Sequence, residues 1–126
     1  MSLAARPRRP IVSRMTWLLV ALGGALGSLA RHGLGAALAA WAPAGTLAAN
    51  LAGCGLIGYL QARLGSEASR ALLMTGFCGG FTTWSAFGLE TVRLLGEGRL
   101  AAGAGYAGLT LALCLGAVAL GWQLGR

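Results

Sequence analysis

Long apolar runs separated by short polar breaks dominate the pattern of this chain. Apolar residues fill four stretches, and glycine, proline and charged residues mark the connections between them. A run of about twenty apolar residues is long enough for one helix to cross a bilayer. We therefore predict four transmembrane helices joined by short loops, at residues 17–40, 46–64, 71–95 and 100–124.

The third run makes a poor continuous helix. Its centre reads Thr75-Gly-Phe-Cys-Gly-Gly-Phe-Thr-Thr-Trp-Ser-Ala-Phe87. Glycine costs backbone entropy in a helix, and Thr and Ser side chains can bond to nearby backbone instead. Interrupted membrane helices often mark ion sites, because non-helical backbone at membrane depth must be buried in protein or line a wet cavity. We predict a break in this helix; a glycine-rich helix packed closely on a neighbour is the alternative.

Composition supports a membrane location. The 126 residues are 56% hydrophobic and only 10% charged, and the mean hydropathy is +0.70. Such values are typical of an integral membrane protein. The 22 glycines fit closely packed membrane helices, and Gly23, Gly27, Arg31 and Gly35 follow one another at a spacing of four. Four helices enclose little space, so we expect a homo-oligomer.

The net charge of +7 is the balance of ten arginines and three acidic residues, and nine of the arginines lie beside the apolar runs or near their ends. This placement indicates a membrane flank rather than a nucleic-acid surface. We predict a basic, disordered tail at residues 1–15 and a membrane domain at residues 16–126. With a cytoplasmic N-terminus, seven arginines lie on that side and two on the other; without the four in residues 1–14 the count is three against two. So small a bias predicts insertion in both orientations.

Cysteine and histidine offer little metal chemistry. Cys54, Cys78 and Cys114 lie inside apolar runs without metal-ligand spacing, and His32 is the only histidine. A disulfide framework or a zinc site is not expected, and a multi-histidine site within one chain is excluded. We interpret the cysteines as small buried residues.

The polar residues inside the runs are rich in hydrogen-bond donors. Arg31 is costly within a span and indicates a functional or pairing role. Asn50 supplies two amide hydrogens, although a buried Asn also serves as packing glue. Thr46, Tyr106 and Thr110 could form a track of hydroxyl groups or bond their own backbone. Glu90 either pairs with Arg93 or lies in a vestibule, and the sequence leaves both open.

This donor set suits an anion. Phe81, Trp84 and Phe87 recur at a spacing of three, and the edges of their rings carry the positive end of the quadrupole. Donors and ring edges in series could replace the water around a small, strongly hydrated anion.

The segment Gly45-Thr-Leu-Ala-Ala-Asn50-Leu-Ala-Gly53 is followed by Gly76-Phe-Cys-Gly-Gly-Phe-Thr-Thr-Trp-Ser-Ala-Phe87 and by Glu90-Thr-Val. This combination resembles the Fluc (CrcB-type) fluoride channel family over about residues 18–124, and Gly23 with Arg31 fits the first helix of that family. The resemblance implies an all-α integral membrane protein of the bacterial inner membrane, an antiparallel, dual-topology homodimer with two pores. It also implies passive export of fluoride and a structural sodium ion at the dimer centre.

By position, the resemblance assigns roles to individual residues. Asn50 matches the pore asparagine, Phe87 the second phenylalanine of the aromatic box, and Tyr106 and Thr110 the hydroxyl track. Thr46 and Arg31 complete the expected fluoride pore, and the backbone carbonyls of Gly79 and Thr82 match the sodium ligands. Three residues depart from the family pattern: Trp84 replaces the first phenylalanine of the box, Ala86 a small hydroxyl residue, and Cys114 a serine of the track.

Other functions fit less well. A small multidrug exporter would need a carboxylate in the first span, where this chain has Arg31. A membrane assembly subunit would explain the glycines but not the donors. An enzyme would need a nucleophile and a base, which His32 beside Arg31 does not supply. No GxxxxGK[ST] motif is present, so we expect neither nucleotide nor nucleic acid as a partner.

Overall fold

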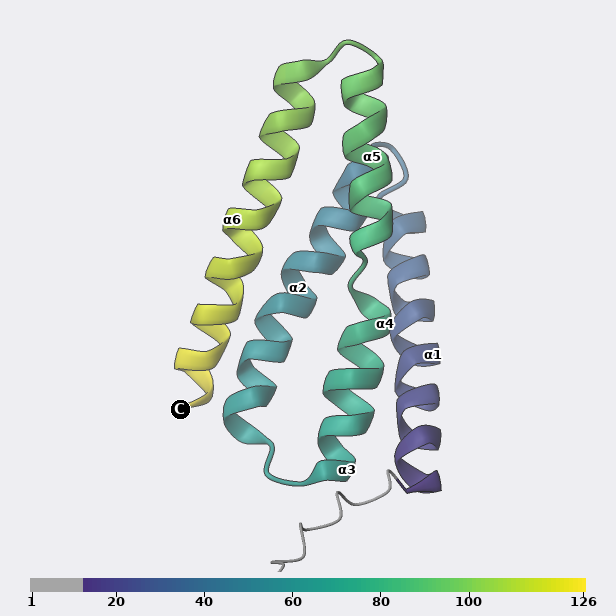
Figure 1. Cartoon of the computed structure of the whole chain (residues 1–126), viewed down its shortest axis with the longest axis vertical. Coiled ribbons are helices and arrows are strands. Elements are labelled where there is room, and N and C mark those ends of the chain that lie inside the picture. The colour runs from purple at the N-terminus through teal and green to yellow at the C-terminus, as the bar shows by residue number, and fades with distance from the viewer. Residues whose placement is uncertain (1–12) are drawn as a thin grey trace, which may run out of the picture.

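The computed structural model describes residues 13–126, which fold into a bundle of helices without a strand in that range (Figure 1). The elements are α1 (Arg14–Ala37), α2 (Ala42–Arg63), α3 (Glu67–Ser69), the π-helical segment η1 (Arg70–Cys78), α4 (Gly79–Phe81), α5 (Trp84–Gly96) and α6 (Leu100–Gly125). The short α3 precedes the third predicted helix, and η1, α4 and α5 follow one another along it. The all-helical architecture is therefore as predicted.

The helix starts differ from the predicted ones for local reasons. Ser13 caps α1, since its hydroxyl accepts a hydrogen bond from the amide of Thr16 (3.2 Å), and α1 begins three residues before the predicted start at residue 17. The start of α2 precedes the predicted residue 46, because Pro43 lies in its first turn, where a missing N–H costs nothing. Most of the tail predicted at residues 1–15 lies outside the described residues.

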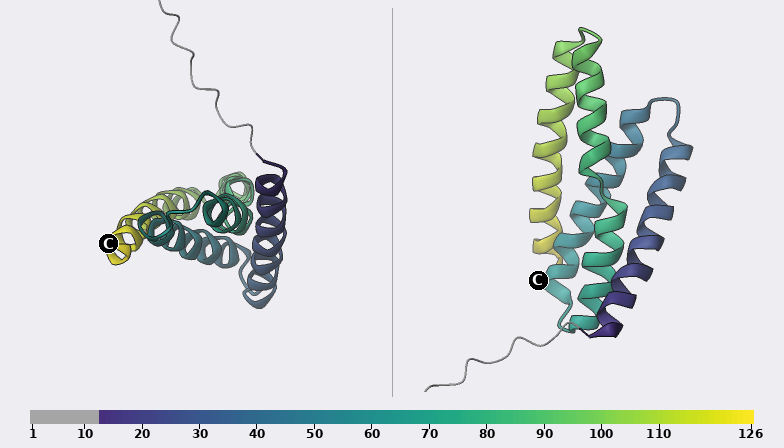
Figure 2. Two further views of the ribbon diagram at one scale, coloured as in Figure 1. Left: turned by 90° about the horizontal axis from the view of Figure 1, so that it is seen from below. Right: turned by 45° about the vertical axis from the view of Figure 1, so that its right-hand side comes forward.

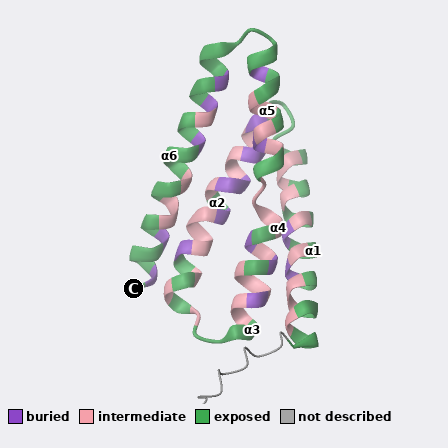
Figure 3. Cartoon of the chain, in the orientation of Figure 1, coloured by how far each residue is buried: buried purple, intermediate pink, exposed green. Residues whose placement is uncertain are grey.

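Two helices, α1 and α6, are long and apolar enough to cross a membrane by length and composition. Their large apolar side chains point outward, and the outer faces of both are largely exposed (Figure 3). The C-terminus lies at the same end of the bundle as the start of α1 (Figure 1). Because both ends lie at the same end of the bundle, the chain must pass along it an even number of times, which agrees with four predicted helices.

Glycines allow two pairs of helices to pack with their backbones in contact. A methyl group at Gly27 of α1 would collide with the carbonyl oxygen of Phe77 in η1, and one at Gly58 of α2 with that of Val118 in α6. Small residues that permit such an approach drive helix association in membranes. The α2–α6 and α1–η1 contacts are the most extensive in the bundle, whereas α1 and α6 do not touch.

The third helix is interrupted at Thr82 and Thr83, whose backbones are extended (ψ 154° and 118°). Before this interruption, η1 and α4 pack on α1; after it, α5 packs on α6 and α2 and does not contact α1. The right-hand view in Figure 2 shows α5 and α6 continuing together beyond the end of α1. The two extended residues therefore transfer the helix from one neighbour to the other.

Candidate functional site

Asn50 of α2 holds the interruption in place. Its Nδ2 donates to the carbonyl oxygen of Thr83 (3.0 Å), and its Oδ1 accepts from the amide of Thr83 (2.6 Å). The hydroxyl of Thr83 accepts from the amide of Ala86 (3.2 Å) and so caps α5. One buried amide side chain thus satisfies both backbone polar groups of Thr83. Asn50 was expected to serve the pore through both donors, but one of its two amide hydrogens is engaged within the chain.

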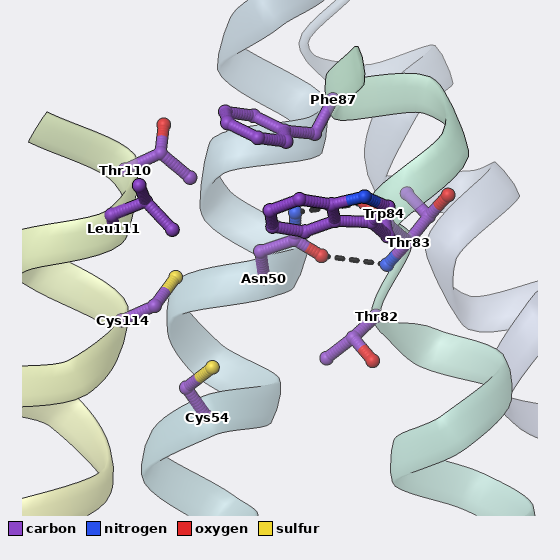
Figure 4. Close-up of a pocket in the computed structure, with 9 residues that line it drawn as sticks. All are labelled: Asn50, Cys54, Thr82, Thr83, Trp84, Phe87, Thr110, Leu111 and Cys114. Atoms are coloured by element: carbon purple, nitrogen blue, oxygen red, sulfur yellow. Dashed lines mark hydrogen bonds between the residues drawn. The ribbon is translucent and has the colours of Figure 1, made fainter. Parts of the chain in front are cut away.

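A cavity of about 190 Å³ lies between α2, α5, α6 and the interruption (Figure 4). We call it the inner cavity; its lining residues are Asn50, Cys54, Thr82, Thr83, Trp84, Phe87, Thr110, Leu111 and Cys114. Thr110 is 4% exposed, and its hydroxyl has no hydrogen-bond partner within residues 13–126. A buried hydroxyl without a partner is costly, so this group indicates a ligand that the chain itself does not provide.

Aromatic rings close one side of the inner cavity. The rings of Trp84 and Phe87 lie 5.0 Å apart at an angle of 49°, and Phe87 contacts Tyr106 at 5.5 Å. Phe87 is 5% exposed, whereas Trp84 is 72% exposed. The expected aromatic pair is therefore present, but only Phe87 is enclosed by its own chain.

A second cavity of about 370 Å³, which we call the outer cavity, lies between α1, α2 and α5. Arg31, Thr46 and Glu90 line it, and Thr83 lines both cavities. The two carboxylate oxygens of Glu90 accept hydrogen bonds from the hydroxyls of Thr46 and Tyr106, each at 2.7 Å. Both hydroxyls are thus committed to a carboxylate rather than free for an anion.

These contacts decide one of the two roles left open for Glu90. Glu90 binds Thr46 and Tyr106 and forms no ion pair with Arg93 in the described part of the chain, so the predicted pairing is wrong. A position in a vestibule stays a prediction. One carboxylate therefore lies among the donor side chains. The sequence contained a signal for this position of Glu90, since Glu90 lies one helical turn after Phe87 and so shares its face.

Arg31 reaches across to the third helix just before the interruption. Its Nε donates to the carbonyl oxygen of Gly80 (3.1 Å), which the hydroxyl of Ser28 also approaches at 3.5 Å. The cationic side chain is half-buried and does not line the inner cavity. It satisfies a carbonyl that the end of α4 leaves without a helical donor.

The predicted pore residues therefore divide between the two cavities. The inner cavity gathers Asn50, Trp84, Phe87 and Thr110, and the outer cavity gathers Arg31 and Thr46. Tyr106 connects the two groups through Phe87 and Glu90. Thr83 is the residue that sequence reasoning missed, and its position directly before Trp84 was the available signal.

Gly79 and Thr82 lie on either side of the end of α4. The hydroxyl of Thr82 donates to the carbonyl oxygen of Cys78 (2.9 Å). The amide of Thr83, which would bond the carbonyl of Gly79 in a continuous helix, bonds Asn50 instead. Within residues 13–126 the carbonyl oxygens of Gly79 and Thr82 have no hydrogen-bond donor.

Comparisons with known proteins agree with the motifs. The family model described as CrcB-like protein, Camphor Resistance (CrcB), matches residues 18–122. A protein of Paracoccus denitrificans (strain Pd 1222) named fluoride-specific ion channel FluC is 46% identical over 117 residues, which cover 88% of this chain and 94% of the relative.

Two further relatives carry similar names. Fluoride-specific ion channel FluC 2 of Rhodococcus jostii (strain RHA1) is 44% identical over 112 residues, covering 87% of this chain and 98% of the relative. Fluoride-specific ion channel FluC of Pseudomonas aeruginosa (strain UCBPP-PA14) is 43% identical over 122 residues, covering 86% and 96%. The matches confirm the resemblance that the second and third runs indicated.

Proposed function

The chain belongs to the CrcB-like protein family, and from this premise we propose that it is a fluoride-specific ion channel that lets fluoride leave the cytoplasm passively. The relatives named above are channels, and this chain covers at least 94% of each of them. Their function therefore transfers to a chain that matches them at 43–46% identity over nearly their whole length.

The unpartnered hydroxyl of Thr110 carries the proposal. It is buried at the wall of the inner cavity, where a hydroxyl donor gains most from an acceptor. Fluoride accepts hydrogen bonds and donates none, so it suits a cavity that offers the Thr110 hydroxyl, the remaining amide hydrogen of Asn50 and the ring edge of Phe87. A hard cation would find few ligands there, because the lining carries no carboxylate.

The outer cavity provides the approach to this position. Arg31 contributes positive charge to its wall, which raises the local concentration of an anion. Glu90 opposes that effect, but each of its oxygens already accepts a hydrogen bond, which stabilises the charge in place. Fluoride passes from one cavity to the other beside Thr83, which lines both.

The proposal includes a structural sodium ion. The carbonyl oxygens of Gly79 and Thr82 are hard, uncharged ligands without donors in the described residues, which is what a hard cation requires. One chain supplies too few such ligands for a complete shell, and Gly79 is exposed at the surface. A second copy that presents the same carbonyls would complete the site.

A second copy also accounts for the exposed aromatic. Trp84, at 72% exposure, projects from the inner cavity, and a partner chain that covered it would close the aromatic side of the path. We propose an antiparallel homodimer with two pores, inserted in both orientations in the bacterial inner membrane. The small arginine bias between the two ends supports this arrangement.

Anion efflux from liposomes tests the proposed function. The purified protein is reconstituted into vesicles loaded with fluoride or with chloride, and an ion-selective electrode records the loss of each ion. We expect rapid loss of fluoride with chloride retained. Retention of both anions by vesicles that contain folded protein would contradict the channel, and loss of both would contradict its selectivity.

A further inference from the structure

Two of the three cysteine thiols lie together in the inner cavity. Cys54 of α2 and Cys114 of α6 both line it, so their side chains enter the same space from two neighbouring helices (Figure 4). Both residues are half-buried, whereas Cys78 is 1% exposed. The expectation that all three cysteines are buried packing residues holds for Cys78 and is wrong for this pair.

The packing of α2 on α6 holds the two thiols in place. One turn after the two cysteines, a methyl group at Gly58 would collide with the carbonyl oxygen of Val118. A methyl group at Gly121 would collide with the carbonyl oxygen of Gly55, the residue that follows Cys54. Backbones in such close contact allow little sliding, so Cys54 and Cys114 stay adjacent. Their side chains come from different helices, so both can approach one atom in the cavity between them.

The chemistry of the pair selects a particular class of ligand. Thiolates prefer soft metal ions over hard ones such as Mg²⁺ or Ca²⁺. Within residues 13–126 no cluster of three or more His, Cys, Asp or Glu side chains exists, so no third protein ligand joins the thiols. Zinc takes four ligands in structural sites, whereas soft monovalent ions with a filled d shell accept two.

We propose that Cys54 and Cys114 form a two-thiolate site for a soft monovalent cation of the Ag⁺ or Cu⁺ class. Each thiol releases its proton to the solvent and forms one sulfur–metal bond, while no electron is transferred. Two thiolates and one monovalent cation leave a net charge of −1 in the inner cavity. Binding therefore strengthens as the pH rises, because the metal competes with protons for the sulfur atoms.

Direct binding tests the site without reference to transport. Silver nitrate is titrated into the purified protein in chloride-free buffer, and bound silver is measured by calorimetry and by elemental analysis after gel filtration. We expect one Ag⁺ per chain in the unaltered protein. In the C54A/C114A variant, which keeps Cys78, this binding is lost, and in either single variant it weakens at least tenfold.

Two controls keep the test decisive. C54S and C114S preserve the size of each side chain, and the gel-filtration profile of each variant shows that it is folded. Silver binding in C54A/C114A equal to that of the unaltered protein would overturn the proposal, as would the absence of tight binding to the unaltered protein.

A consequence for transport rests on the proposed function. A metal bound here would occupy the cavity beside Asn50 and Thr110 and add a negative charge that repels fluoride. We expect Ag⁺ to block fluoride efflux from vesicles in nitrate medium, a thiol reductant to restore it, and C54A/C114A to be insensitive. If silver binds but no fluoride efflux occurs even without silver, the channel proposal fails and the metal site stands. If fluoride efflux is normal and no silver binds, the metal site fails and the channel proposal stands.

Discussion

The third helix has two parts that are held in different ways. Before the interruption, η1 and α4 lie against α1 through glycines, with backbone contacting backbone. After it, α5 lies against α6 through the rings of Phe87 and Tyr106 and the hydrogen bonds of Glu90. The glycine contacts at Gly23 and Gly27 leave no room for a side chain, whereas the second part leaves the inner cavity beside it.

This difference shows how a small bundle can be both tightly held and open. Glycine contacts maximise dispersion and need no polar partner, so they anchor the helix without creating a site. Side-chain contacts hold the helices farther apart, and the side chains on the facing sides of the helices line the space that remains. Four substitutions test this difference between the two parts of the third helix. They follow in order of the expected effect on fluoride efflux, from the largest to the smallest.

Gly27→Leu should have the largest effect. The side chain would be forced into the carbonyl of Phe77 and within 2.8 Å of the amide of Phe81, in a contact made of backbone that cannot move aside. Overpacking of this kind costs about 1–3 kcal/mol or more. We expect loss of folded protein, measured as the monodisperse fraction in detergent, and hence loss of all efflux. Gly33→Leu, where nothing lies within 4 Å, is the matched control on the same helix.

Asn50→Asp should reduce fluoride efflux by about a hundredfold, because the lost hydrogen bond and the added charge each cost about 1.5 kcal/mol. The carboxylate cannot donate to the carbonyl oxygen of Thr83, and its charge repels the anion. The liposome assay measures the rate, and the gel-filtration profile establishes folding. Undiminished efflux from a folded variant would remove Asn50 from the path.

Thr110→Val should reduce efflux by about tenfold, because one donor to the anion is lost. It should also leave the thermal midpoint of unfolding unchanged or raise it, since the variant no longer buries an unpartnered hydroxyl. Thr91→Val is the control, because the Thr91 hydroxyl donates to the carbonyl of Phe87 (2.8 Å) and its loss should lower the midpoint. A lower midpoint in Thr110→Val would mean that its hydroxyl has a partner within the protein.

Tyr106→Phe should have the smallest effect, less than about threefold. The ring contact with Phe87 remains, and the lost hydroxyl served Glu90 rather than the anion. A loss as large as that of Thr110→Val would show instead that the Tyr106 hydroxyl leaves Glu90 and donates to fluoride during transport. The same liposome assay compares the two variants.

Much of this protein follows from its sequence. Four apolar runs predicted four helical passes, because each backbone in a membrane must bond within its own helix. Glycines and hydroxyl residues predicted the weak centre of the third run for a local reason, since they lower the helical preference of residues 75–87. Asn50 and Thr110 stood out because polar groups are rare in apolar runs.

Tertiary structure alone decided how these groups are used. Whether the Asn50 amide faces a ligand or the backbone of Thr83 depends on how α2 lies against the interruption, which no local pattern specifies. Glu90 meets Thr46 and Tyr106, 44 and 16 residues away along the chain. Cys54 and Cys114 line the same cavity because glycines bring α2 onto α6. Spacing along one helix predicts which residues share a face; the partner of that face is set by packing between helices.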